Sequence, residues 1–200
     1  MASWGDSGNS MVDQVDLQRV SMTLRWGGWA RFWVQVALGI VVVVVLLFNN
    51  IGGRVAANAQ RALGLGPGLS LTSLSFFVLL WSLWQAWLVV RCGRALASSV
   101  RPSKAETGRL IKRSLLADLL GLLMAAIGYQ ALAGSLFMQA SMQAPGLFGP
   151  MAVQGTRGPI SYPITSIEML AVLSNTQVLF AHLIGLLMSL WLLQKVYRRA

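Results

Sequence analysis

The sequence alternates between four long apolar segments and shorter polar segments that hold nearly all of its charged residues. A helix needs about 20 apolar residues to cross the roughly 30 Å hydrocarbon core of a bilayer, and each apolar segment is long enough to do so. The pattern therefore predicts an all-α, polytopic membrane protein with four transmembrane helices. We place the spans near residues 30–48, 69–90, 114–137 and 167–194, within one transmembrane domain over residues 29–195.

Composition and charge agree with a membrane protein and predict its orientation. Charged residues make up 11% of the 200-residue chain and hydrophobic residues 56%, whereas soluble domains carry about 25% charged residues. The formal net charge is +10, and 13 of the 16 Lys and Arg residues precede the first span or, like Arg31, lie at its edge, separate the second span from the third, or follow the fourth. Cytoplasmic loops are enriched in Lys and Arg. We therefore expect both termini to be cytoplasmic, with residues 196–200 forming a basic cytoplasmic tail.

The segment before the first span, residues 1–28, is expected to be a cytoplasmic region with a short amphipathic helix. Ser10 followed by Asp13 is a weak helix-capping signature ahead of residues 11–24. Two interpretations of this helix stay open. It lies against the membrane or a partner, or it is a loosely held amphipathic leader.

A dense group of basic residues separates the second and third apolar segments. Such a group beside two membrane helices can bind anionic lipid headgroups, or it can serve only to hold this loop on the cytoplasmic side. No groove-reading module or stacking surface accompanies the charge, so nucleic-acid binding is not expected. The residues of this lipid-facing basic loop are Arg94, Arg101, Lys104, Arg109, Lys112 and Arg113.

Asp118 and His182 are the two titratable residues well inside the expected spans, where such side chains are costly enough to suggest function. With the span limits above and a rise of 1.5 Å per residue, Asp118 lies about 11 Å from the centre of its span, whereas His182 lies at the centre of its own. A direct Asp118–His182 pair is therefore not expected, and Ser189 is the expected partner of Asp118.

On the fourth helix, Asn175, His182 and Ser189 recur every seven residues and so share one face. Together with Asp118 they form our candidate intramembrane polar site. A structural role and an ion- or proton-handling role both stay open for it.

Small residues accompany these polar positions. Gly121, Ala125 and Gly128 share a face of the third helix, and Gly185 lies on the polar face of the fourth. Because small residues let membrane helices approach closely, this helix-packing seam predicts an antiparallel hairpin of the third and fourth spans.

The sequence gives no sign of catalytic chemistry. One His and a few scattered acids do not supply a ligand set for a metal cage, although any bound metal remains an open question. A nucleophile–base arrangement and a Gly-rich phosphate loop are both missing from the sequence. We therefore expect neither a cofactor nor enzymatic activity.

Two stretches resemble a known family. Residues 25–40 contain Gly28-Trp29 followed by Phe32-Trp33-Val34-Gln35, and residues 175–193 contain Ala181-His182 followed by Gly185 and Ser189-Leu190-Trp191. These motifs are similar to those of cyanobacterial and plastid four-span proteins grouped as a domain of unknown function, and the similarity extends over residues 12–199. Plastid members are called permease in chloroplasts, and also the small inner-envelope subunit of the protein-import translocon. The resemblance singles out Trp29, Gln35, Asn175 and His182 as family features.

The resemblance implies two competing functions. In the first, the chain is an iron permease or a membrane subunit that supports iron uptake. In the second, it is a non-conducting scaffold or assembly subunit of a protein-translocation complex or another membrane complex. Four helices with a single His at the centre make a thin lining for a metal path, so we expect a homo-oligomer or a larger complex within the lipid bilayer. The expected location is a cyanobacterial plasma or thylakoid membrane, with the plastid inner envelope for the plastid relatives.

Overall fold

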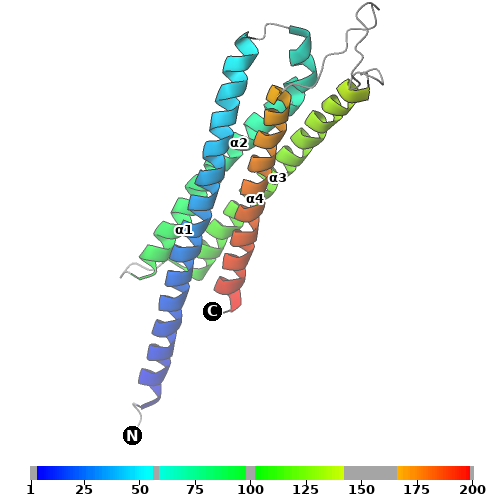
Figure 1. The fold of residues 1–200 in the computed structure, drawn as a ribbon. Helices are drawn as coiled ribbons and strands as arrows, with labels where there is room; N and C mark the ends of the chain where they lie inside the picture. Colours follow the sequence, from blue (N-terminus) through cyan, green and yellow to red (C-terminus); the bar gives the residue numbers. More distant parts are fainter. Residues whose placement is uncertain (1–3, 56–58, 98–101, 142–165, 199–200) are drawn as a thin grey trace, which may run out of the picture.

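The computed structural model describes residues 4–55, 59–97, 102–141 and 166–198, which form four long helices (Figure 1). They are α1 (Trp4–Val55), α2 (Ala59–Ala95), α3 (Lys104–Ser141) and α4 (Ser166–Arg198). Each contains a stretch long and apolar enough to cross a membrane, namely Gln18–Phe48, Gly68–Ala95, Lys104–Met138 and Glu168–Tyr197. The prediction of an all-α protein with four membrane-spanning helices is confirmed.

The helices extend beyond the limits expected from the sequence. α1 runs without a break from Trp4 to Val55, so the expected amphipathic segment is not a separate helix. α3 begins at Lys104, well before residue 114, because Ser103 and Glu106 form a capping box. The Ser103 side chain accepts a hydrogen bond from the Glu106 N–H at 3.1 Å, and the Glu106 carboxylate accepts one from the Ser103 N–H at 2.9 Å.

The four helices run alternately up and down, so the start of α1 and the end of α4 lie at the same end of the bundle (Figure 1). α1 packs beside α2 and α4, and α3 also packs beside α2 and α4. α2 and α4 approach each other across one diagonal. Within the described ranges, α1 and α3 lie across the other diagonal with no close approach of their backbones.

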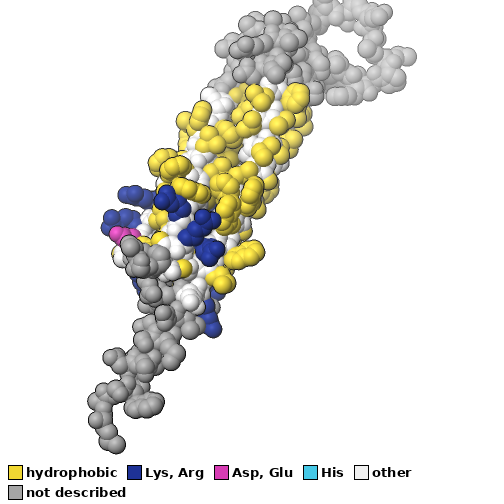
Figure 2. All heavy atoms as spheres, turned by 90° about the vertical axis from the view of Figure 1, so that its left-hand side faces the viewer, with side chains coloured by type: hydrophobic (Ala, Val, Ile, Leu, Met, Phe, Trp, Pro, Cys, Tyr) yellow, Lys and Arg dark blue, Asp and Glu magenta, His cyan; other side chains and the backbone are white. Residues whose placement is uncertain are grey.

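Buried positions along each helix are spaced three and four residues apart. On α2, for example, Thr72, Ser75, Leu79, Ser82 and Ala86 are all buried. This spacing is typical of bundles in which side chains of one helix fit between those of its neighbours. Many outward-facing side chains are large and apolar, and a band of them covers the described surface above a group of Lys and Arg (Figure 2). An apolar exterior of this kind is suited to lipid.

The core forms layers along the bundle. At the end where α2 stops and α3 starts, which we call the basic end, the buried apolar residues are Leu24, Val89, Leu96, Ile111, Leu192 and Val196. Toward the other end lies a second cluster of Val42, Ala125 and Val178, followed by Leu132 and Ala171. Between the first cluster and the second, the buried side chains are mostly polar.

Candidate functional site

An ion pair between α1 and α3 lies at the centre of the polar layer. Arg31 Nη2 is 2.8 Å from Asp118 Oδ2, and the two side chains are 1% and 0% exposed. The N–H is not aimed at Oδ2 as it would be in a hydrogen bond, so this contact is an ion pair by distance alone. Since α1 and α3 lie diagonally opposite each other, the long Arg31 side chain crosses the middle of the bundle to reach Asp118.

Hydroxyl groups from the other helices surround the Arg31 guanidinium. Arg31 donates to Ser82 of α2 at 2.7 Å and to Ser189 of α4 at 2.7 Å, and it also donates to Ser114 of α3. Arg31 Nε also donates to the side-chain Oε1 of Gln35 at 3.4 Å. The arginine is therefore held by groups from all four helices.

The other carboxylate oxygen of Asp118, Oδ1, contacts three polar side chains. Oδ1 accepts hydrogen bonds from Ser82 Oγ at 2.6 Å and from Gln35 Nε2 at 3.2 Å, and His182 Nδ1 lies 3.4 Å away. In a low-dielectric interior such a carboxylate is stable only with this degree of pairing. We call the connected set the buried polar network; it consists of Arg31, Gln35, Ser82, Ser114, Asp118, His182 and Ser189.

The imidazole of His182 lies between two acceptors. Its Nε2 is 3.1 Å from the carbonyl oxygen of Ser75, which can only accept, so Nε2 carries a proton. Its Nδ1 faces the Asp118 carboxylate, so the ring donates to both neighbours only when both nitrogens are protonated. The ring fits here because Gly121 has no side chain; a Cβ at that position would overlap the imidazole.

A second polar contact lies farther from the basic end. Asn175 Nδ2 donates to the carbonyl oxygen of Ala125 at 3.0 Å, and its Oδ1 accepts from Thr72 Oγ1 at 2.7 Å. Gly128 faces the same amide, while a Cβ on Gly185 would collide with Gln35 and with the Asp118 carboxylate. The residues of the helix-packing seam are all buried, but they face more than the α3–α4 contact, because Gly128 also lies against α2 and Gly185 against α1.

The expectation that Asp118 and His182 would not meet is wrong. It rested on a third span beginning at residue 114, whereas the span in the structure is Lys104–Met138, with its midpoint at Gly121. Asp118 is therefore close to the centre of the bundle, at the level of His182. The expected Asp118–Ser189 hydrogen bond is also replaced, because Ser189 bonds to Arg31, which in turn pairs with Asp118.

Arg31 is the main residue that the sequence interpretation missed, because it was counted as a topology signal at the edge of the first span. One signal could have found it: Arg31 lies seven residues after Leu24 and four before Gln35, on the same buried face. Gln35 was noted only through the family resemblance. Trp29, noted in the same way, stacks on Trp33 at 6.0 Å between ring centroids.

The basic residues named from the sequence gather at the basic end, outside the network. Arg94, Lys104, Arg109, Lys112 and Arg113 are exposed on α2 and α3, and Arg101 lies outside the described residues. The part of the chain that the structure describes contains no group of three or more His, Cys, Asp or Glu side chains that could hold a metal ion.

The chain matches one protein-family model and is similar to a chloroplast protein. A family model described as "Protein of unknown function (DUF3611)" matches residues 14–197. The chain is also similar to Protein TIC 21, chloroplastic, of Arabidopsis thaliana, with 24% identity over 197 residues. That match covers 94% of this chain but 64% of the relative, so the chain spans less than two thirds of the relative's length. No solved structure matches the chain significantly.

Proposed function

Because the chain belongs to the DUF3611 family, we propose that this integral membrane protein is a transport-related subunit, with iron as the cargo that the family resemblance implies. The observation that supports the proposal most is the contact of Asp118 with His182 near the centre of the spans. Imidazole and carboxylate are both ligand types used for ferrous iron. Ionisable side chains inside a membrane bundle mark ion pathways and proton relays.

In this proposal Arg31 acts as a resident cation. It lies 2.8 Å from the Asp118 carboxylate, and a metal ion would have to compete for the same group. Apolar clusters close the network on both sides along the bundle, and its charged side chains have almost no exposed surface. The described arrangement therefore corresponds to a closed state, and cation passage requires Arg31 to leave Asp118.

The test is uptake of ferrous iron by liposomes that contain the purified chain. His182→Ala and Asp118→Asn remove one candidate ligand each, whereas Gln130→Ala changes an exposed polar residue on α3 as a matched control. We expect uptake to be lost in the first two variants and kept in the control, with all three folded by circular dichroism. Unchanged uptake in folded His182→Ala would reject the role of the network in iron transport.

A second candidate function is a non-conducting scaffold or assembly subunit. It is favoured by the network itself, which joins side chains from all four helices and so holds one fixed packing. The similar protein from Arabidopsis thaliana carries a name that the family resemblance links to protein import. Purification from native membranes in mild detergent distinguishes the two functions. A stoichiometric complex with larger proteins, without iron uptake, supports the scaffold. A homo-oligomer without partners supports the permease.

We also propose that the basic end faces the cytoplasm in a cyanobacterial plasma or thylakoid membrane, and that the chain is not an enzyme. The concentration of Lys and Arg at this end supports the orientation (Figure 2).

A further inference from the structure

A tyrosine of α4 lies between two lysines of α3 at the basic end of the bundle. A Cβ built on Gly108 would be 3.0 Å from the Tyr197 hydroxyl, so the ring rests on α3 at a position that has no side chain. Lys104 and Lys112 come four residues before and four residues after Gly108, on the same face of α3. Their ammonium nitrogens are 5.6 and 5.8 Å from the centroid of the Tyr197 ring. Two cations therefore converge on one aromatic ring.

These groups have no negative partner among the described residues. Neither ammonium group has an acidic side chain of that part of the chain within ion-pair distance. Glu106, the acid nearest in the sequence, instead accepts a hydrogen bond from the N–H of Ser103. Tyr197 is 51% exposed, and its hydroxyl forms no hydrogen bond with the described residues. Two positive charges and a hydroxyl donor without an acid are complementary to an anion. We call Lys104, Lys112 and Tyr197 the tyrosine–lysine site.

The tyrosine–lysine site lies where two membrane spans end. Lys104 and Tyr197 are the terminal residues of their spans. Lys112 is attached about 12 Å farther along α3 at 1.5 Å per residue, but its long side chain brings the ammonium group back toward the Tyr197 ring, as lysines near the ends of membrane helices do. The three groups are therefore at the level of the membrane surface, which lipid headgroups and soluble anions both reach.

The charge and the donors of the site fit a phosphomonoester. Such a group carries a charge of about −1.5 to −2 at pH 7 and has three acceptor oxygens, which match two ammonium groups and one hydroxyl donor. A phosphodiester or a carboxylate carries one negative charge, so it would leave one lysine without compensation.

We propose that the tyrosine–lysine site binds a phosphomonoester group, carried by a lipid such as phosphatidic acid or by a soluble molecule such as glycerol 3-phosphate. The ammonium groups of Lys104 and Lys112 pair with the phosphate, and the Tyr197 hydroxyl donates to one of its oxygens. The proposal does not depend on iron transport, because none of these residues belongs to the buried polar network.

The test measures binding to the full chain in detergent micelles, by native mass spectrometry and by the shift of the unfolding temperature. Phosphatidic acid is compared with phosphatidylglycerol, which has the same acyl chains but a phosphodiester headgroup. We expect phosphatidic acid to bind about five-fold more tightly, because one more compensated charge near the surface contributes about 1 kcal/mol. Glycerol 3-phosphate is then added as a competitor. Displacement of the lipid supports a site that also takes soluble phosphomonoesters, and retention of the lipid supports a site for the lipid headgroup.

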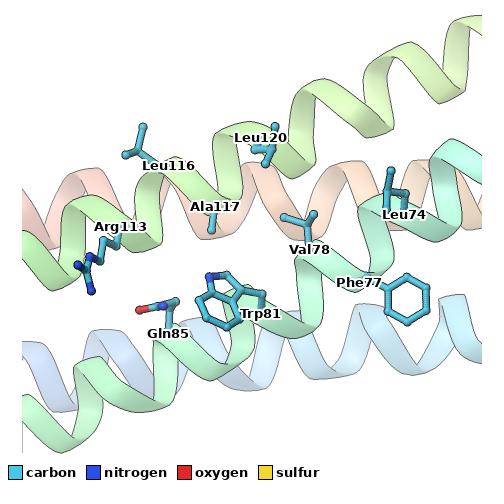
Figure 3. Close-up of a pocket in the computed structure, with 9 residues that line it drawn as sticks. All are labelled: Leu74, Phe77, Val78, Trp81, Gln85, Arg113, Leu116, Ala117 and Leu120. Atoms are coloured by element: carbon cyan, nitrogen blue, oxygen red, sulfur yellow. The ribbon is translucent and has the colours of Figure 1, made fainter.

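Variants assign the contacts. Lys104→Gln and Lys112→Gln should each weaken binding of phosphatidic acid about five-fold. Arg113→Gln is the matched control, because it makes the same charge change one residue after Lys112. Arg113 points from α3 toward α2 and lines a groove of about 560 Å³ between these two helices, whereas Tyr197 belongs to α4 (Figure 3). The control should change binding less than about two-fold, since salt screens charges that do not touch the ligand.

Tyr197→Phe tests the hydroxyl alone, because it keeps the ring on which both lysines lie. It should weaken binding of phosphatidic acid about three-fold through the loss of one hydrogen bond to a charged group. The unfolding temperature of the ligand-free protein should stay the same.

Two results would overturn the proposal. The first is equal binding of phosphatidic acid and phosphatidylglycerol by the unaltered chain. The second is an equal loss of binding in Lys112→Gln and Arg113→Gln, which would mean diffuse attraction of anions to the whole basic end.

Discussion

Neutralising one member of the Arg31–Asp118 pair should destabilise the bundle strongly, and neutralising both should restore much of the loss. At 2.8 Å and an effective dielectric constant of about 20, the attraction between two unit charges is about 6 kcal/mol, part of which offsets the cost of removing both from water. Asp118→Asn leaves the guanidinium with neutral partners only. We expect the free energy of unfolding to fall by about 3–5 kcal/mol, the usual result of breaking a buried pair.

The double variant Arg31→Gln with Asp118→Asn keeps hydrogen-bonding side chains but leaves no unpaired charge. We expect the two losses to be non-additive by at least about 2 kcal/mol, since residues in one ion pair couple by up to about 3 kcal/mol.

The assay is unfolding by sodium dodecyl sulfate in mixed micelles, followed by tryptophan fluorescence and circular dichroism. Gln130→Ala serves as the control, because this exposed residue should leave the free energy of unfolding unchanged. If the losses of unfolding free energy in the two single variants add up to that of the double variant within about 0.5 kcal/mol, the reasoning is refuted, because the two charges then do not interact.

Three further predictions concern helix packing, capping and orientation. Gly121→Ala, whose new Cβ would overlap the His182 ring, should cost about 1–3 kcal/mol, whereas Gly134→Ala, with nothing within 4 Å of its Cβ, should be neutral or slightly stabilising in the same unfolding assay. Ser103→Ala should cost about 1 kcal/mol and speed hydrogen exchange in the first turn of α3; unchanged exchange would contradict the capping role. With Cys92→Ser as background, Ala105→Cys should react with an impermeant maleimide only from the cytoplasmic side, and labelling from the opposite side would reverse the proposed orientation.

The general architecture could be predicted from the sequence because apolar length and the distribution of charge act locally. The four spans and the family resemblance are both confirmed, the latter by the match over residues 14–197. Asn175, His182 and Gly121 were identified because polar and small residues at helical spacing indicate packing faces in membranes.

The charged centre could not be predicted in the same way. An arginine at the end of an apolar run normally marks the interface, and only the position of Asp118 on a diagonal helix makes burial of Arg31 favourable. The contact of His182 with Asp118 was missed because the start of α3 depends on the Ser103–Glu106 cap, which moved the centre of that span by several residues.

The diagonal ion pair also has a consequence for biogenesis. Arg31 is in α1, which is synthesised before α3 and α4, yet its carboxylate partner Asp118 is in α3 and one of its hydroxyl partners is in α4. An unpaired arginine at the centre of a membrane helix costs about 3 kcal/mol even on the scale of the insertion machinery. α1 therefore gains its full stability in the bilayer only after α3 has been synthesised, and nascent chains that end before Asp118 carry an uncompensated charge within the membrane.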